Sequence, residues 1–361
     1  MAAIVSEAAR AKTVDIADVE VVAPNFKRRL SGVTTTVVQL IPLQSRSIGI
    51  ATLGPGLPAS LPAIGWWQLW GLLRRPRRRP FRIWHARRNV EMIGGIILRD
   101  LLRAPLKIVF TSAAQRDHKP FTKWLIRRMD AVIATNQRSA SFLEVPHTVI
   151  LHGVNLEQFH PARDPQDDFA TAQLPGKRAI GCFGRVRHQK GTDLFVDAMI
   201  RLLPEFPDWT AVITGRVTVE HQAFAQELQR KVAAAGLSER ILFLGEVPDI
   251  KVWYRRVSLY VAPSRNEGFG LTPLEAMASG SAVVTSDAGA YTDLVLHGDT
   301  GFVVAAGDGK ALTDAIRSYL ADPEMLKRHS ANALADMHRR FPLEGEAAAI
   351  GKVYEALWAK G

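Results

Sequence analysis

The chain has very little cysteine and no long apolar run. Its single cysteine, Cys182, excludes a disulfide framework and is typical of a reducing compartment. Cys182 lies in an apolar run, which favours a small buried residue over a nucleophile. The most apolar stretch, residues 61–73, is short and contains Pro62 and two glycines, so we expect no membrane-spanning helix. The first 20 residues have no apolar signal-peptide core, so we expect a cytoplasmic protein.

Acidic residues are scarce in the first half of the chain. The net charge is +11, and residues 1–165 hold 24 Lys and Arg against 11 Asp and Glu. The remaining residues hold 22 against 24, so the positive charge belongs to the N-terminal half alone. This half therefore favours an anionic partner: a membrane surface, a phosphorylated glycolipid or a nucleic acid.

Length and composition are those of a globular protein of two or three domains. The 361 residues are 47% apolar and 22% charged. Runs typical of strands and helices alternate along the whole chain, which predicts a parallel α/β architecture.

The most informative stretch is Pro263 to Asp287, PSRNEGFGLTPLEAMASGSAVVTSD. An apolar strand, Ser258 to Pro263, opens into a loop that carries Glu267 and two glycines. A helix from Leu271 to Ser279 follows, with Thr272 as its N-cap, and then a second strand. A strand, a glycine loop and a helix N-terminus in this order place backbone N–H groups against an anion.

Glu267 and Glu275 stand eight residues apart in this stretch. Two glycines after Glu267 let a ligand approach the backbone. Glu275 lies on a short helix between two apolar strands, where an unpaired carboxylate is costly and sugar hydroxyls would be suitable partners. The alternative is an ordinary α/β crossover with an acidic residue near a helix start.

The segment EGFGLTPLEAMASG resembles the E-x7-E signature of the family 4 retaining glycosyltransferases, which have the GT-B fold. The resemblance implies that Glu267 lies by the donor sugar and its diphosphate, and that Glu275 holds the nucleotide ribose. The donor-binding residues that it implies are Gly32, Gly184, Glu267, Gly268, Phe269, Gly270, Leu271 and Glu275.

A second motif follows the strand Ala179 to Phe183 and reads GRVRHQKG. It resembles the G-R-x4-K-G motif of the same family. Arg185 and Lys190 project from a glycine turn at the end of a strand, where they can neutralise a diphosphate. The alternative is a solvated basic turn. No Asp-x-Asp metal motif occurs in the chain, so we expect no metal or other cofactor, with the nucleotide diphosphate sugar as a co-substrate.

The motifs of the N-terminal half are less clear. The loop Lys27 to Gly32 resembles the first strand-to-helix turn of the family, with Ser31-Gly32 where paired glycines are usual. His85 is placed at the carboxyl edge of the strand Phe81 to His85, where ligands bind, although a structural role is equally compatible. The family often has a histidine after the strand Lys107 to Ser112, and here His118 could supply the imidazole. The catalytic candidates are Glu267, Arg185, Lys190, His85 and His118.

An aromatic and basic segment stands out at residues 65–88, GWWQLWGLLRRPRRRPFRIWHARR. Tryptophan beside arginine suits the interface of an anionic bilayer. A packed amphipathic helix followed by a solvated loop is the alternative. The candidate acceptor and membrane residues are Trp66, Trp67, Trp70, Arg74, Arg75, Arg77, Arg78 and Arg79.

The resemblance implies two Rossmann-like domains facing a cleft. We expect an acceptor domain at residues 1–165, a nucleotide-sugar domain at 177–343, and a C-terminal helix at 344–361 that packs on the first. Pro161 to Lys177 is rich in proline and aspartate and is interpreted as the linker.

The chain as a whole most resembles the lipopolysaccharide core mannosyltransferases of rhizobia-like bacteria. This resemblance implies retaining transfer of a hexose, mannose from GDP-mannose, to a lipopolysaccharide core or related glycolipid. The enzyme would then work at the inner face of the inner membrane as a peripheral protein and bind no nucleic acid. Two alternatives remain: a GT-B nucleotide-sugar epimerase, and a basic nucleic-acid-binding protein without catalysis.

Overall fold

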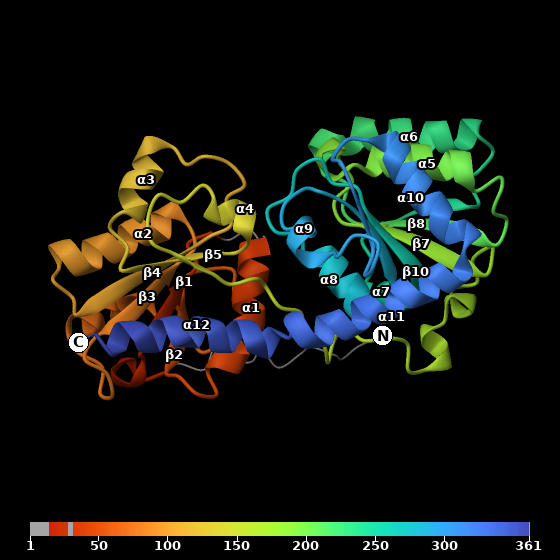
Figure 1. Ribbon diagram of the computed structural model, residues 1–361. Helices are drawn as coiled ribbons and strands as arrows, with labels where there is room; N and C mark the ends of the chain where they lie inside the picture. Colours follow the sequence, from red (N-terminus) through yellow and green to blue (C-terminus); the bar gives the residue numbers. More distant parts are fainter. Residues whose placement is uncertain (1–13, 28–31, 361) are drawn as a thin grey trace, which may run out of the picture. The chain divides into compact units, whose positions relative to one another are not determined.

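The structure, a computed structural model, describes residues 14–27 and 32–360. It divides into two compact units: unit 1 comprises Met1–His152 and Leu343–Gly361, and unit 2 comprises Gly153–Pro342. Within the described residues, each unit contains one sheet of six parallel strands (Figure 1). The predicted α/β class with two Rossmann-like domains is confirmed. Among these residues, no helix combines the length and the apolar character needed to cross a bilayer.

The sheet of unit 1 has the strand order β2-β1-β3-β4-β5-β6. Its strands are β1 (Val21–Pro24), β2 (Ile50–Leu53), β3 (Arg82–Ala86), β4 (Leu106–Ser112), β5 (Ala131–Ala134) and β6 (Thr148–Val149). β2 pairs with one edge of β1, and the chain then crosses over so that β3 pairs with the other edge of β1. The order therefore reverses between β1 and β3, and such a point is where open α/β sheets bind ligands.

Helices cover both faces of this sheet (Figure 1). They are α1 (Gly32–Gln44), α2 (Asn89–Ile96), α3 (Pro120–Ile126), α4 (Gln137–Ala140) and α12 (Leu343–Trp358), with the 3-10 helices η1 (Ile16–Asp18) and η2 (Trp66–Leu73) and the π-helix η3 (Ile97–Leu101). Strand side chains alternate between the two faces. Val22 and Trp84 share a core with η2, α2, η3 and α3, whereas Val21 and Ile83 share the other core with α1 and α12.

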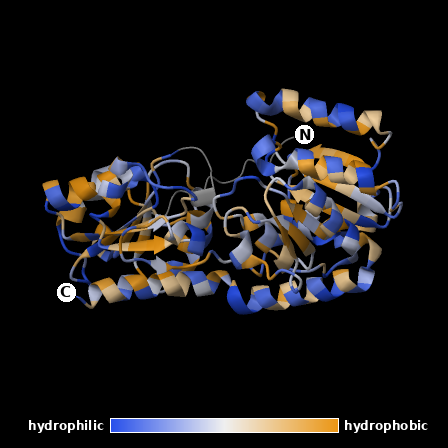
Figure 2. Cartoon of the chain, turned by 45° about the horizontal axis from the view of Figure 1, so that its top comes forward, coloured by the Kyte–Doolittle hydropathy of each residue, from blue (hydrophilic) through white to orange (hydrophobic). Residues whose placement is uncertain are grey.

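The sheet of unit 2 has the order β12-β11-β10-β7-β8-β9. Its strands are β7 (Arg178–Phe183), β8 (Trp209–Thr214), β9 (Ile241–Gly245), β10 (Val257–Ala262), β11 (Ala282–Ser286) and β12 (Phe302–Val304). These strands are almost entirely apolar, as expected for a parallel sheet buried on both faces (Figure 2). The order reverses between β7 and β10, so this edge is the expected ligand position in unit 2.

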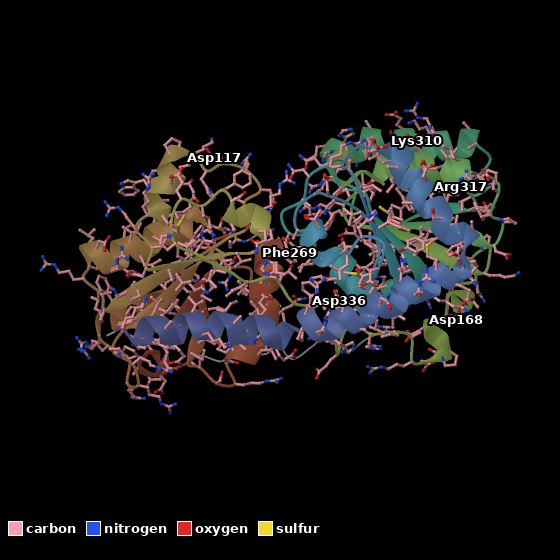
Figure 3. The ribbon with its side chains drawn as sticks, viewed as in Figure 1. Asp117, Asp168, Phe269, Lys310, Arg317 and Asp336 are labelled. Carbon is pink, nitrogen blue, oxygen red and sulfur yellow. The ribbon has the colours of Figure 1, made fainter. Side chains whose placement is uncertain are left out.

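The helices of unit 2 pack on both faces of its sheet. They are α5 (Thr192–Leu202), α6 (Gln222–Ala234), α7 (Ile250–Arg256), α8 (Leu271–Ala278), α9 (Tyr291–Leu294), α10 (Gly309–Ala321) and α11 (Pro323–Arg340), with the 3-10 helices η4 (Pro165–Asp167), η5 (Phe169–Ala172), η6 (His188–Lys190) and η7 (Val219–His221). Asp336 on α11 is buried and accepts hydrogen bonds from Arg340, which also donates to the carbonyls of Asp293 and Leu294 at 3.1 Å (Figure 3). This network fixes the short helix α9 against α11.

The segment interpreted as a linker, Pro161 to Lys177, lies wholly in unit 2, because the chain changes units at Gly153. It forms η4 and η5 and buries Phe169. Asp167 pairs with Arg255 at 2.9 Å. Its proline and aspartate residues start and cap short helices instead of forming a flexible connection. The C-terminal helix α12 is assigned to unit 1.

Candidate active site

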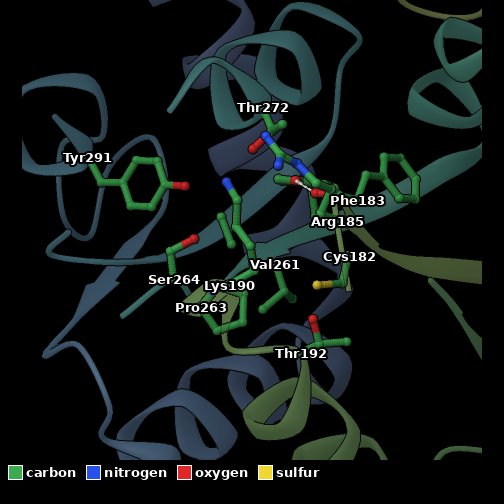
Figure 4. A pocket seen from close by; sticks show the side chains of 13 residues that line it. Cys182, Phe183, Arg185, Lys190, Thr192, Val261, Pro263, Ser264, Thr272 and Tyr291 are labelled. Atoms are coloured by element: carbon green, nitrogen blue, oxygen red, sulfur yellow. Dashed lines mark hydrogen bonds between the residues drawn. The ribbon is translucent and has the colours of Figure 1, made fainter. Parts of the chain in front are cut away.

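The candidate active site of unit 2 lies where the strand order reverses, at the carboxyl ends of β7 and β10. A pocket there is lined by the residues that follow both strands and by side chains from α8 and α9 (Figure 4). Its lining includes Gly184, Arg185, Lys190, Tyr260, Ser264, Thr272 and Tyr291. A second depression shares Phe183, Gly184, Arg185 and Thr272 with it and extends to Glu246, Val247, Tyr254 and Glu275. The two neighbouring depressions bring together Gly184, Arg185 and Lys190 of one motif with Thr272 and Glu275 of the other, while Glu267 is not among their lining residues.

The loop after β7 is held in place by close packing against the loop after β10. Gly191 has a φ of +69°, and a Cβ there would lie 2.0 Å from the Pro263 carbonyl oxygen, so only glycine fits. Arg265 donates both guanidinium nitrogens to the Asp193 carboxylate at 2.7 Å, and its backbone N–H donates to the Gln189 carbonyl at 2.9 Å. This bidentate pair was not identified from the sequence. Either residue alone looks like an ordinary surface charge, and only the fold brings them together.

Lys190 and Glu267 form an ion pair across these two loops. Their side chains are only 20% and 16% exposed, so water screens the pair less than it would at the surface. Arg185 is half-buried and lines both depressions. The two motifs, predicted separately, therefore share one charged site with two cations and one carboxylate.

The loop Glu267 to Gly270 leads into α8. Gly270, with a φ of +97°, is the N-cap, and the helix begins at Leu271. The prediction of Thr272 as N-cap was therefore wrong by two residues, because the positive φ that ends the loop requires the glycine. Phe269 is buried and its carbonyl accepts the Ala290 N–H at 3.1 Å (Figure 3). The loop consequently rests on the turn before α9.

Glu275 lies half-buried in the second depression. Its Oε2 accepts a hydrogen bond from the Tyr254 hydroxyl at 2.8 Å. Burial raises the pKa of this carboxyl, while the Tyr254 hydrogen bond and the nearby Lys190 charge oppose that rise. Glu275 is thus a carboxylate held in a partly desolvated position. Tyr254 was not singled out from the sequence, because it comes from α7 and only the packing of α7 against α8 brings it to Glu275.

Cys182 lines the first pocket but is buried. Burial raises the pKa of its thiol to about 12, which keeps it protonated and excludes a thiolate nucleophile at neutral pH. Within the described part of the chain, no three His, Cys, Asp or Glu side chains are grouped as a metal site would require.

In unit 1, the structure places His85 in the core. Its side chain is fully buried, Nδ1 pairs with the Tyr354 hydroxyl at 2.6 Å, and Nε2 pairs with Thr111 Oγ1 at 2.7 Å. Since both ring nitrogens are engaged within unit 1, we interpret His85 as a structural residue that ties β3 and β4 to α12. His85 lies near the carboxyl end of β3 as expected, but its side chain is buried like every residue of that strand. These contacts favour the structural role that the sequence had left open.

His118 lies in the loop that follows β4, and its Nε2 is 3.3 Å from Ser112 Oγ. It is partly exposed, and burial lowers the pKa of its imidazole, which favours the neutral ring at pH 7. Of the two histidines, His118 is the one that a ligand at the carboxyl end of β4 could reach.

The loop Lys27 to Gly32, predicted to be the first strand-to-helix turn, lies largely outside the described residues. Residues 28–31 lie outside the described part of the chain, and α1 begins at Gly32. A donor-binding role for Gly32 stays a prediction.

The aromatic and basic segment is only partly available to a partner. Trp66, Trp67 and Trp70 lie on the 3-10 helix η2, and their side chains are 57%, 74% and 73% exposed. Arg74, Arg75 and Arg78 are exposed.

Two arginines of this segment have structural partners within unit 1. Arg77 pairs with Asp15 and Asp18. Arg79 pairs with Glu20 and Glu355 and stacks on Trp358 at 4.0 Å. They bind acidic residues that are distant in the sequence, although Arg77 remains 60% exposed. The interpretation of the five arginines as one anion-binding group stays a prediction, and Arg74, Arg75 and Arg78 are the members outside these pairs.

Comparisons with known proteins agree with this geometry. The sequence model of the family "Glycosyl transferases group 1" matches residues 164–336. The lipopolysaccharide core biosynthesis mannosyltransferase LpcC of Rhizobium leguminosarum bv. viciae is 67% identical over 344 residues, covering 95% of this chain and 98% of that protein. The corresponding enzyme LpsB of Rhizobium meliloti (strain 1021) is 57% identical over 349 residues, covering 95% and 99%.

Among solved structures, Anabaena Alr3699/HepE in complex with UDP matches with a TM-score of 0.79 at 20% identity, covering 93% of this chain and 100% of that one. This similarity supports the GT-B fold. The near full-length relatives, the matched family and the E-x7-E and G-R-x4-K-G motifs joined in one site show that the chain belongs to the group 1 glycosyltransferases.

Proposed function

We propose that the protein transfers mannose from GDP-mannose to a lipopolysaccharide core acceptor, with retention of configuration at the anomeric carbon. The observation that carries this proposal is the similarity of 67% and 57%, over nearly the whole chain, to two lipopolysaccharide core mannosyltransferases. The geometry of unit 2 supplies the groups that donor binding needs. The similarity to these transferases extends over the N-terminal half as well as the C-terminal half. An epimerase or a nucleic-acid-binding protein would not account for it.

The donor diphosphate would bind in the first pocket. Arg185 and Lys190 line it, and the backbone N–H groups at the start of α8 add the positive end of a helix dipole. Lys190 has three N–H donors, so it can keep its bond to Glu267 and bind a phosphate oxygen at the same time. These groups oppose the negative charge that grows on the diphosphate as it leaves, which is why we propose that no metal ion is required.

Glu275 and Glu267 would orient the rest of the donor. A carboxylate offers about four acceptor positions, and Tyr254 occupies one at Glu275, which leaves acceptor capacity for the ribose hydroxyls. The second depression continues to Glu246 and Val247, where the nucleoside base would lie. Glu267, held by Lys190, would orient the sugar through its hydroxyls without forming a covalent bond to it.

The acceptor would bind to unit 1. His118 follows β4, and its lowered pKa leaves a neutral imidazole that can accept the proton of the attacking hydroxyl. His85 has no part in this step, because its ring nitrogens are both bonded inside the core.

Unit 1 also presents a one-sided apolar layer that fits a membrane surface. Twelve large apolar side chains are exposed among the described residues, and ten of them lie between residues 66 and 124. They belong to η2, α2, η3, α3 and the residue after η3, all on the same face of the sheet. They are Trp66, Trp67, Trp70, Leu73, Val90, Ile97, Leu101, Leu102, Phe121 and Trp124.

The opposite layer, α1 and α12, contributes none of these side chains among the residues described. Arg74, Arg75 and Arg78 are exposed beside the layer, directly after η2. We propose that the layer places unit 1 on an anionic bilayer, at the inner face of the inner membrane, as a peripheral protein.

Calorimetric titration of the full chain with GDP-mannose, UDP-glucose and ADP-glucose, without divalent metal, tests the donor. We expect micromolar binding of GDP-mannose only, and at least ten-fold weaker binding by Glu275→Gln because a charged hydrogen-bond acceptor is lost. Glu205→Gln is the matched control, since Glu205 pairs with Arg317 at the surface. Selective binding of UDP-glucose or ADP-glucose would contradict the proposal that GDP-mannose is the donor. Binding of none would overturn the donor site itself.

A further inference from the structure

Tyr291 is the first residue of α9, and its hydroxyl lines the first pocket. The side chain is fully buried. Figure 4 shows the hydroxyl pointing toward Lys190 and Ser264, on the side of the pocket opposite Arg185. Neither sequence motif contains Tyr291, and none of the roles assigned above depends on it.

The Tyr291 hydroxyl makes no hydrogen bond of 3.5 Å or less within the described residues, although the Ser264 and Thr272 hydroxyls lie close enough to interact with it weakly. The other tyrosines of this site differ: Tyr254 donates to Glu275 at 2.8 Å and Tyr260 to the Phe183 carbonyl at 3.2 Å. Native proteins leave few buried polar groups unpaired, because the lost hydration is not replaced. An unpaired hydroxyl that lines a binding pocket therefore points to a partner that enters with the ligand.

The surrounding backbone is shaped to hold this ring. A Cβ on Gly270 would lie 2.1 Å from Tyr291 Cε1, so the glycine of the donor loop leaves the space that the ring fills. The Ala290 N–H donates to Phe269, and Arg340 donates to the carbonyls at the end of α9. Tyr291 is thus fixed from both sides before any ligand binds, which makes its hydroxyl a preorganised donor.

The chemistry of the pocket selects the partner. Lys190 and Arg185 bring positive charge, and Ser264 and Thr272 bring further hydroxyls. Burial, with the Glu267 charge nearby, raises the pKa of the Tyr291 hydroxyl well above its ordinary range, so it stays protonated and can donate. Among ligand groups, phosphate oxygens combine negative charge with the capacity to accept several hydrogen bonds.

We propose that the Tyr291 hydroxyl donates a hydrogen bond to the terminal phosphate of the nucleoside diphosphate, the leaving group of the transfer. This inference rests on the proposed function, because it requires that the pocket binds a nucleotide diphosphate sugar. The hydrogen bond strengthens as charge develops on the departing phosphate, so Tyr291 contributes to turnover as well as to binding.

The test compares Tyr291→Phe with the wild-type full chain. The substitution removes one oxygen and keeps the ring that fills the space beside Gly270. We expect an unchanged melting temperature, affinity for GDP reduced about 10-fold, unchanged affinity for GMP, and kcat with GDP-mannose reduced about 10- to 100-fold. Tyr319→Phe is the control, because Tyr319 bonds to His329 in the core of unit 2. It should lower the melting temperature and leave both nucleotide affinities unchanged.

The outcomes separate the two proposals. If wild-type protein binds GDP and Tyr291→Phe binds it equally well, with equal kcat, the role of Tyr291 is overturned while the donor site stands. If the variant loses affinity for GMP as much as for GDP, the contact with the terminal phosphate is overturned. If wild-type protein binds no nucleoside diphosphate, both the proposed function and this inference fail.

Discussion

Unit 2 and unit 1 have the same kind of sheet but differ in how their functional residues are specified. In unit 2, one glycine loop carries Arg185 and Lys190 and another carries Glu267, each directly after a strand at the point where the strand order reverses. In unit 1, the candidate residues are spread over β3, the loop after β4 and η2, and the fold buries some while exposing others. Contiguous motifs therefore predict which side chains lie close together, whereas the placement of single residues on separate elements needs the tertiary structure.

The largest effect is expected in the unit 2 site. Lys190→Ala or Glu267→Ala should lower kcat by about 10²–10³, because each removes a preorganised charged group from the proposed diphosphate and sugar positions. Steady-state kinetics with GDP-mannose measures this change. Lys310→Ala, which removes an exposed lysine paired with Asp314, is the control and should leave kcat unchanged. If both variants turn over at the wild-type rate, Lys190 and Glu267 do not have the proposed roles in the transfer.

The proposed membrane surface of unit 1 gives the next largest expected effect. Replacing Arg74, Arg75 and Arg78 with Ser should weaken binding to vesicles of anionic lipid by about 100-fold, since each basic residue near such a surface adds favourable energy. Vesicle co-sedimentation measures the partition, and affinity for GDP-mannose should not change. The matched control replaces three exposed arginines of unit 2, Arg201, Arg230 and Arg328. Equal losses in both triple variants would show a general charge effect and contradict the proposed surface.

The two histidines of unit 1 sharpen the comparison further. His85→Ala should destabilise the protein by about 2–4 kcal/mol, because two buried hydrogen bonds are lost and the Tyr354 and Thr111 hydroxyls are left unpaired. His118→Ala should change the stability little and lower turnover instead. Denaturant unfolding and kinetics on both variants measure the two quantities. A reversed pattern would exchange the structural and catalytic roles.

The smallest expected effect is a pH dependence of stability at Glu275. Its pKa is raised in the folded protein, so folding favours the protonated carboxyl. Wild-type stability from this group is therefore greatest below the unfolded pKa of about 4.3 and is lost as the pH rises through the folded value. Glu275→Gln keeps an acceptor for Tyr254 without the charge, so its stability relative to wild type should increase between pH 4 and pH 7. Thermal unfolding across this range measures the trend, and a constant difference would contradict it.

Several features of the fold were predictable because they depend on local pattern. The strands of unit 2 are apolar runs that end in glycine loops, and such runs are typical of a parallel sheet that is buried on both faces. Glu267 and Lys190 were identified from their motifs, and the structure adds that they bind each other. The helix start at Leu271 was predicted, but its N-cap was misplaced, because the positive φ of Gly270 follows from the loop and helix-capping preferences alone do not reveal it.

Other features could not be predicted because they depend on residues distant in the chain. Arg79 was grouped with its neighbours, but Glu20 and Glu355 hold it in place. Tyr291 stands outside both motifs and reaches the pocket only because Gly270 leaves room for its ring.

The sequence by itself determined the α/β class, the two glycine loops and the charged residues that they carry, because these follow from hydrophobic period and from short-range backbone geometry. Only the tertiary structure decided which arginines pair with acidic residues, that His85 is internal, and that Tyr291 lines the first pocket. Burial and pairing are set by contacts between elements that are far apart in the chain, and no local pattern encodes them.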